Sequence, residues 1–118
     1  MKLLLLFPLI LLSFASCKTT KNYSAHSMED KKLYDMLSML NKSSKNKKAT
    51  RSLPVVYAES QQNHLNKINS YKNYTTISRW DSIFYEYKIL QTIYYAVNNT
   101  DTTNSIIKPI NYQNYITN

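Results

Sequence analysis

The chain has 118 residues, a formal net charge of +8, two histidines, one cysteine and no glycine. A chain of this length makes one small domain rather than two. The single cysteine excludes an internal disulfide. Without glycine, Gly-rich phosphate loops, dinucleotide fingerprints and most tight β-hairpins lack the residue that they need. We therefore expect no multi-stranded β domain.

Residues 1–17 have the layout of a secretory signal. Lys2 gives a positive start, residues 3–12 are apolar apart from Pro8, and small residues lead up to Cys17. The apolar run of roughly 10 residues is shorter than the ~20 that a membrane-spanning helix needs, so we expect a cleaved signal.

The end of this segment, made of Phe14, Ala15, Ser16 and Cys17, resembles the lipobox of bacterial lipoproteins, with Phe14 where that family most often has Leu. The resemblance implies cleavage between Ser16 and Cys17 and acyl chains on Cys17 that anchor the protein to a membrane. Ordinary cleavage after Ala15, which would release a soluble protein, stays open. Lys18 follows the cysteine where lipoproteins retained in the inner membrane of enteric bacteria have Asp. We therefore favour the outer membrane, with the domain facing the periplasm.

We divide the chain into four segments. Residues 1–16 are the predicted signal peptide, and residues 17–27 are the lipidated cysteine and a polar, flexible tether. Residues 28–98 are a helical domain, and residues 99–118 form a polar C-terminal tail. The polar composition of the tail predicts a frayed or loosely packed terminus. The alternation at residues 110–112 leaves open an extended arm that lies on the bundle or adds to a partner sheet.

A first helix is predicted over about residues 28–41, with an extension toward Lys48 left open. Ser27 fits an N-cap, and Glu29 and Asp30 suit the positive end of a helix dipole. Apolar residues then recur at helical spacing, namely Leu33, Met36, Leu37 and Leu40.

Residues 42–51 carry five cations and no acid. One reading is a solvated connection whose cations favour the negative end of the first helix. The other is a contact surface for lipid phosphate or another polyanion. This candidate anionic-surface contact consists of Lys42, Lys45, Lys47, Lys48 and Arg51.

Two further helices are predicted. Ser52 fits the cap of the second, with Pro54 in its first turn, and Asn73 fits a left-handed residue at its end. Ser78 fits the cap of the third, over residues 79–98. This helix is apolar on two sides, so we place it centrally and expect Trp80 to be buried against the second helix. The predicted fold is all-α, a small antiparallel three-helix bundle or a helical hairpin with a leading helix.

Two consecutive helix-turn-helix units are also similar to the tetratricopeptide family, although only one hairpin is visible and no binding residue carries over. Residues 53–94 look like helical regions in lipoproteins of Gram-negative bacteria. The positions that carry this likeness are Leu53, Pro54, Tyr57, Ala58, His64, Ile68, Tyr71, Arg79, Trp80, Ile83, Tyr87, Leu90, Ile93 and Tyr94.

Little in the sequence indicates chemistry. No second metal ligand stands at a suitable spacing from His26 or His64, and His64 fits a half-buried helix residue. No two carboxylates lie three or four apart in the predicted helices, so paired acids would have to come from different elements. We expect no enzyme, no metal, no cofactor, no small-molecule substrate and no nucleic acid partner.

The predicted function is a membrane-anchored lipoprotein of the bacterial cell envelope that acts as a small helical interaction or assembly module, with a protein partner in the envelope. The alternative is a soluble exported binding domain for cell-wall glycan or another envelope ligand, because tyrosine-rich surfaces can stack on sugars. Lipidation of Cys17 distinguishes the two.

Overall fold

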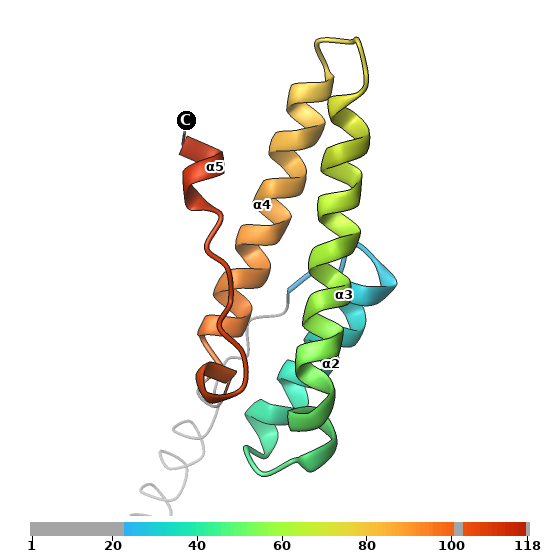
Figure 1. The fold of residues 1–118 in the computed structure, drawn as a ribbon. Coiled ribbons are helices and arrows are strands. Elements are labelled where there is room, and N and C mark those ends of the chain that lie inside the picture. The colour runs from blue at the N-terminus through green and yellow to red at the C-terminus, as the bar shows by residue number, and fades with distance from the viewer. Residues whose placement is uncertain (1–22, 101–102, 118) are drawn as a thin grey trace, which may run out of the picture.

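The computed structural model describes residues 23–100 and 103–117. These residues form α2 (Met28–Lys42), α3 (Lys47–Lys72), α4 (Arg79–Asn98), the 3₁₀ turn η1 (Thr103–Ser105) and the short α5 (Gln113–Thr117). The three long helices run antiparallel to their neighbours in the chain (Figure 1). The prediction of an all-α fold built on a small three-helix bundle is confirmed. The predicted signal peptide, Ser16, Cys17 and most of the tether lie outside the described residues.

α2 begins where the sequence predicts. The Ser27 side chain accepts a hydrogen bond from the backbone N–H of Asp30 at 3.1 Å, which satisfies one of the free donors at the helix start. The helix ends at Lys42 and does not extend to Lys48.

α3 begins five residues earlier than Ser52, the predicted cap. Asn46 is the N-cap, and its side chain accepts from the N–H of Ala49 at 3.1 Å. Pro54 therefore lies inside the helix rather than in its first turn. Thr50, four residues before it, has a carbonyl that receives no N–H from proline.

The α3–α4 loop closes without a left-handed residue. Asn73 has φ −84° and ψ −7°, so it is right-handed and the prediction for it is wrong. Ser78 precedes α4 as predicted but makes no side-chain capping bond. The end of α3 is instead tightened by the hydrogen bond from Tyr74 N–H to the Tyr71 carbonyl.

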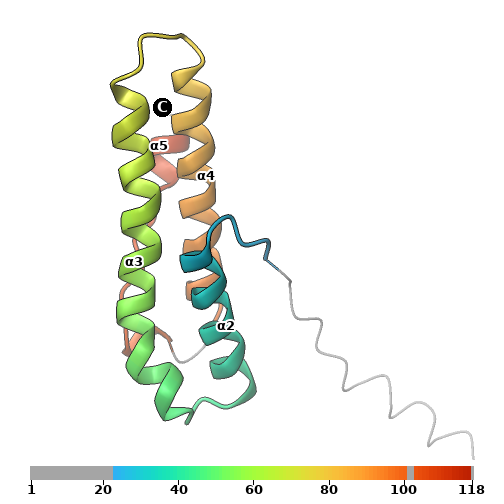
Figure 2. The same cartoon turned by 90° about the vertical axis from the view of Figure 1, so that its right-hand side faces the viewer.

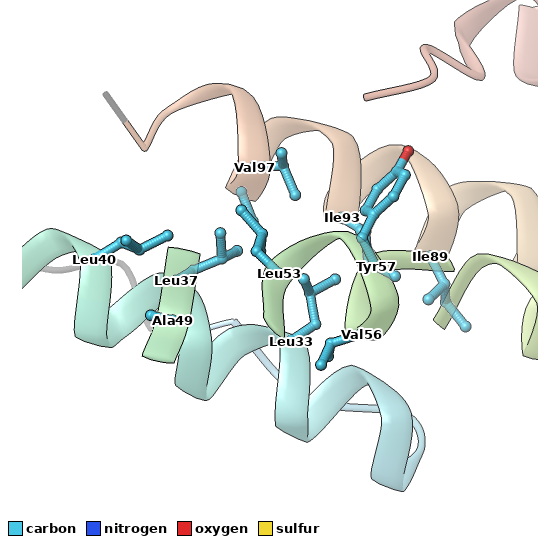
Figure 3. Close-up of a cluster of buried hydrophobic side chains, with 11 residues drawn as sticks. Leu33, Leu37, Leu40, Ala49, Leu53, Val56, Tyr57, Ile89, Ile93 and Val97 are labelled. Atoms are coloured by element: carbon cyan, nitrogen blue, oxygen red, sulfur yellow. The ribbon is translucent and has the colours of Figure 1, made fainter. Parts of the chain in front are cut away.

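α3, not α4, is the central helix, because α3 packs along both α2 and α4 whereas α2 and α4 meet only briefly. The main core forms where the three helices converge (Figure 3). It consists of Leu33, Leu37, Leu40, Ala49, Leu53, Val56, Tyr57, Ile89, Ile93, Ala96 and Val97. The connection from α2 to α3 lies at one end of the bundle and the α3–α4 loop at the other (Figures 1 and 2).

The C-terminal segment packs on the bundle, so the prediction of a frayed terminus is wrong and the alternative of an arm on the bundle is confirmed. Residues 106–112 run beside α4 and lead into α5 (Figure 1). Tyr112 is buried in a second core cluster with Ile68, Ile83 and Leu90. The arm thus covers the side of α4 that faces away from α2, which explains why α4 is apolar on two sides.

Candidate functional site

Each of the three long helices sends one titratable side chain to the same buried point. These are Asp30 of α2, His64 of α3 and Glu86 of α4. The exposed fraction is 0% for Asp30 and His64 and 4% for Glu86. Sequence analysis predicted a half-buried His64 and a dipole-stabilising Asp30, and it did not single out Glu86 as part of a site. We call these three side chains the buried triad.

His64 stands between the two carboxylates. Its Nδ1 lies 2.6 Å from Glu86 Oε2, and its Nε2 lies 2.9 and 2.8 Å from the two Asp30 oxygens. A carboxylate only accepts hydrogen bonds, so when both carboxylates are ionised both ring nitrogens donate and the ring is an imidazolium. One positive charge then faces two negative charges inside the bundle.

Asp30 has further partners. Ser60 Oγ donates to Asp30 Oδ1 at 2.7 Å, and the backbone N–H of His26 donates to Oδ2 at 3.3 Å. Its two oxygens therefore receive hydrogen bonds from α3 and from the residues just before α2. This saturation reduces the cost of burying the carboxylate.

Opposing effects set the pKa values of the triad. Burial disfavours the charged imidazolium, but hydrogen bonds to Asp30 and Glu86 outweigh it and raise the pKa of His64 above its ordinary 6.5. Burial also disfavours the Asp30 carboxylate, but hydrogen bonds from His64 and Ser60 outweigh it and lower the pKa of Asp30 below its ordinary 3.8. Both shifts favour the charged forms of His64 and Asp30 in the folded domain.

The geometry of the triad fits a role in specifying how the three helices pack. Both His64 nitrogens are occupied by carboxylates, and within residues 23–100 and 103–117 no three His, Cys, Asp or Glu side chains could hold a metal ion. A surface hollow of about 430 Å³ between α2 and α3 is lined by Glu29, Lys32, Glu59, Gln62, Asn63 and Asn66, none of which is a triad member. A substrate reaching that hollow would not meet His64.

The predicted basic contact surface lies at the α2–α3 end of the bundle. All five of its side chains are exposed, and they surround the connection between the two helices. Lys42 is in the last turn of α2, where a cation suits the helix dipole. Lys47 and Lys48 are in the first turn of α3, where the positive end of the helix dipole disfavours a cation. The helix dipole therefore explains the position of Lys42 only.

Apolar side chains gather at the opposite end, on the α3–α4 loop and the first turns of α4. We call Tyr74, Ile77, Trp80 and Phe84 the hairpin tip. Ile77 is 89% exposed and Trp80 is 57% exposed, and Tyr74 and Phe84 are also exposed. The prediction that Trp80 is buried against the second helix is wrong. Trp80 is the second residue of α4, next to the α3–α4 loop at this end of the bundle (Figure 2).

A second polar network fixes the C-terminal arm. The backbone N–H of Tyr112 donates to Gln91 Oε1 at 2.6 Å, and its hydroxyl donates to Gln61 Oε1 at 2.8 Å. The N–H of Ile110 donates to the Tyr57 hydroxyl at 2.9 Å. Side chains of α3 and α4 thus bind two backbone N–H groups and the Tyr112 hydroxyl of the arm.

Two members of the buried triad stand out in the sequence. His64 interrupts an apolar stripe, and Glu86 lies three residues after Ile83 and four before Leu90, on a face that is otherwise apolar. Charged residues inside a core stripe are rarely buried unless they are paired. Which partners they have depends on the packing of three helices, and no local pattern gives that.

Comparison with protein-family models, with curated proteins and with solved structures finds no match to this chain. Among the residues that the structure describes, no helix is both long enough and apolar enough to cross a bilayer.

Proposed function

We propose that the chain is a lipoprotein of the bacterial cell envelope, anchored by acyl chains on Cys17, whose helical domain is a small interaction or assembly module without catalysis. The sequence of residues 1–17 supports the anchor, because a short apolar run ends in a lipobox-like segment with the only cysteine. Lys18 supports an outer-membrane location with the domain in the periplasm.

The observation that carries the interaction part of the proposal is the exposed hairpin tip. Most apolar side chains of the three helices and the arm are packed in the two core clusters. Ile77 and Trp80 nevertheless stay exposed at one end of a small domain. Grouped apolar side chains on a surface are typical of interaction sites.

The basic contact surface, at the other end of the bundle, is a separate candidate for contact with an anionic membrane. Lys47 and Lys48 stand at the positive end of the α3 dipole, in a first turn without an acid, so their position costs stability rather than adding to it. Near an anionic bilayer each cation contributes up to about 1 kcal/mol of binding. Such binding weakens as salt shortens the Debye length from about 10 Å to about 3 Å.

Lipidation is the decisive test of the anchor. Cells that express the full chain are fed a clickable fatty acid, and the mature N-terminus is determined by mass spectrometry. We expect label on the wild type, a mature chain that begins at Cys17, and no label on Cys17→Ser. An unlabelled wild-type protein that begins at Ser16 would contradict the proposal.

The second candidate function is a soluble exported module that binds wall glycan. The exposed rings of Trp80 and Tyr74 favour it, because aromatic faces stack on sugars. It predicts retention on insoluble peptidoglycan by the wild type and loss of retention by Trp80→Ala. It also predicts an unlabelled chain in the fatty-acid experiment.

A further inference from the structure

We propose that the hairpin tip binds the surface of an anionic phospholipid bilayer, with Ile77 and Trp80 entering the interfacial layer and nearby cations facing the headgroup phosphates. The inference rests on the proposed function for the presence of a membrane next to the domain, and it names the partner of the tip.

The tip is placed where a flat surface can reach it. The α3–α4 loop forms one end of the bundle and extends beyond α2 and α5 (Figures 1 and 2). Ile77 lies in this loop, and Trp80 and Phe84 follow it by three and seven residues, on one face of α4. Trp80 and Phe84 therefore share a face of α4, and Ile77 lies in the loop just before it.

Two aromatic rings of the tip each have a cationic side chain next to them. The guanidinium carbon of Arg79 lies 4.8 Å from the centroid of the Trp80 ring, and Lys88 Nζ lies 5.1 Å from that of Phe84. Arg79 also donates to the Tyr74 carbonyl, which fixes its guanidinium beside the loop. A ring paired with a long cationic side chain suits the boundary between acyl chains and headgroups, because the ring is apolar and the cation stays in water.

The net charge around the tip is positive. Between residues 67 and 88 the cations are Lys67, Lys72, Arg79 and Lys88, and the acids are Asp81 and Glu86. Glu86 is buried and paired with His64, so Asp81 is the one acid of this stretch that solvent reaches. The exposed charge near the tip is therefore positive and complements a surface of anionic lipids.

The size of the tip favours a bilayer over a protein partner. Aromatic side chains bury 150–250 Å² when fully covered, and those of the tip are about half covered already, so the tip offers roughly 400 Å². A standard protein interface takes about 800 Å² from each partner. A bilayer needs no shape complementarity, and a few apolar side chains with flanking cations bind it reversibly.

Trp80 is the only tryptophan, so its fluorescence reports on the tip without a label. The protein for the test is the chain from residue 17 onward with Cys17→Ser, which carries no acyl group. The buried residues of both core clusters lie between Leu33 and Tyr112, so this chain keeps the whole described core. Far-UV circular dichroism checks that each variant is equally helical.

The protein is titrated with vesicles of phosphatidylcholine alone and of an equal mixture of phosphatidylcholine and phosphatidylglycerol. We expect a blue shift of Trp80 emission with the anionic vesicles, quenching by brominated lipids, and weaker binding in about 1 M than in about 0.1 M salt. Ile77→Asp should weaken binding at least about tenfold, because it replaces an inserted apolar side chain with a repelled acid.

Val55→Asp is the matched control, since Val55 is also exposed but lies on α3 toward the other end of the bundle. It should leave binding within about twofold of the parent. A second comparison replaces the five residues of the basic contact surface by Gln. If this replacement abolishes the blue shift and Ile77→Asp does not, the membrane contact lies at the basic end and the inference is wrong.

Two other results would also overturn the inference. One is an unchanged emission spectrum with both vesicles, which would leave the tip to a protein or glycan partner. The other is a blue shift that grows with protein concentration in the absence of vesicles, which would make a second copy of the chain the occupant. Because the chain tested has no acyl group, none of these outcomes depends on whether Cys17 is lipidated, which the fatty-acid experiment decides separately.

Discussion

Replacing His64 by alanine should destabilise the domain severely. The imidazolium is the common partner of Asp30 and Glu86, at 2.8 and 2.6 Å. Its removal leaves two buried carboxylates without their cation and opens a cavity between three helices. Loss of one partner of a buried ion pair costs about 3 to 5 kcal/mol, out of a total stability of about 5 to 15 kcal/mol for a small domain.

The assay is thermal and urea unfolding followed by circular dichroism. At about 4 °C or more per kcal/mol for a domain of this size, His64→Ala should lower the midpoint by more than about 12 °C. His26→Ala is the matched control, because His26 is the other histidine and its side chain is exposed. A triple variant with Asp30→Asn and Glu86→Gln added to His64→Ala should recover part of the loss, because it removes the buried negative charges.

The same triad makes stability depend on pH in a defined direction. The pKa of His64 is raised on folding, so its contribution is fully present below its ordinary 6.5 and is lost as pH rises through the folded value. The pKa of Asp30 is lowered on folding, so its contribution is present above 3.8 and is lost as pH falls through the folded value. Wild-type stability should decline on both sides, and His64→Ala should lack the alkaline decline. If His64→Ala and His26→Ala unfold within about 1 kcal/mol of each other, the triad does not hold the bundle together.

Three further predictions use the same unfolding assay. Tyr112→Phe should cost about 1 to 2 kcal/mol, because it leaves the Gln61 carbonyl oxygen buried without its hydroxyl donor; an unchanged midpoint would mean that the arm does not hold this bond in solution. Leu53→Ala should cost about 2 to 5 kcal/mol in the main core, whereas Val55→Ala, two residues away and exposed, should cost less than about 0.5 kcal/mol. Trp80→Ala should cost less than about 1 kcal/mol, well below the 3 to 5 kcal/mol of a buried tryptophan, and a larger loss would place the indole inside the fold.

The helices themselves were accessible from sequence because local signals define them. Ser27 followed by acids and spaced leucines predicted α2, and α4 runs over the predicted residues. The start of α3 was missed because Pro54 suggested a first turn. Asn46 caps the helix earlier and the helix tolerates the proline, since only one backbone hydrogen bond is lost.

The burial of α4 was harder to predict because its two apolar stripes do not say what covers them. Trp80 lies on one stripe with Ile83 and Leu90, yet only the latter two are buried. The cover on this side is the C-terminal arm, and Tyr112 reaches Ile83 and Leu90 but not the first turn. The spacing of apolar residues identifies the apolar face of a helix. How much of that face is buried depends on where the neighbouring segments end.

The candidate sites also differ in whether a local stretch of sequence defines them. The basic contact surface could be located from sequence because a run of cations is a local feature that stays exposed. The buried triad joins residues 22 and 34 positions apart along the chain, so its pairing appears only in the folded bundle. The burial of Trp80 was predicted wrongly for the same reason, since its exposure depends on how far the C-terminal arm covers α4.

The backbone of the described residues contains no positive φ angle. Every turn in these residues is therefore built from conformations that all L-amino acids adopt at little cost. A chain without glycine also samples fewer conformations when it is unfolded, so it loses less entropy on folding than a glycine-containing chain of equal length. In this domain the missing glycines require no strained turn, and part of the stability of the bundle comes from the stiffness of its unfolded state.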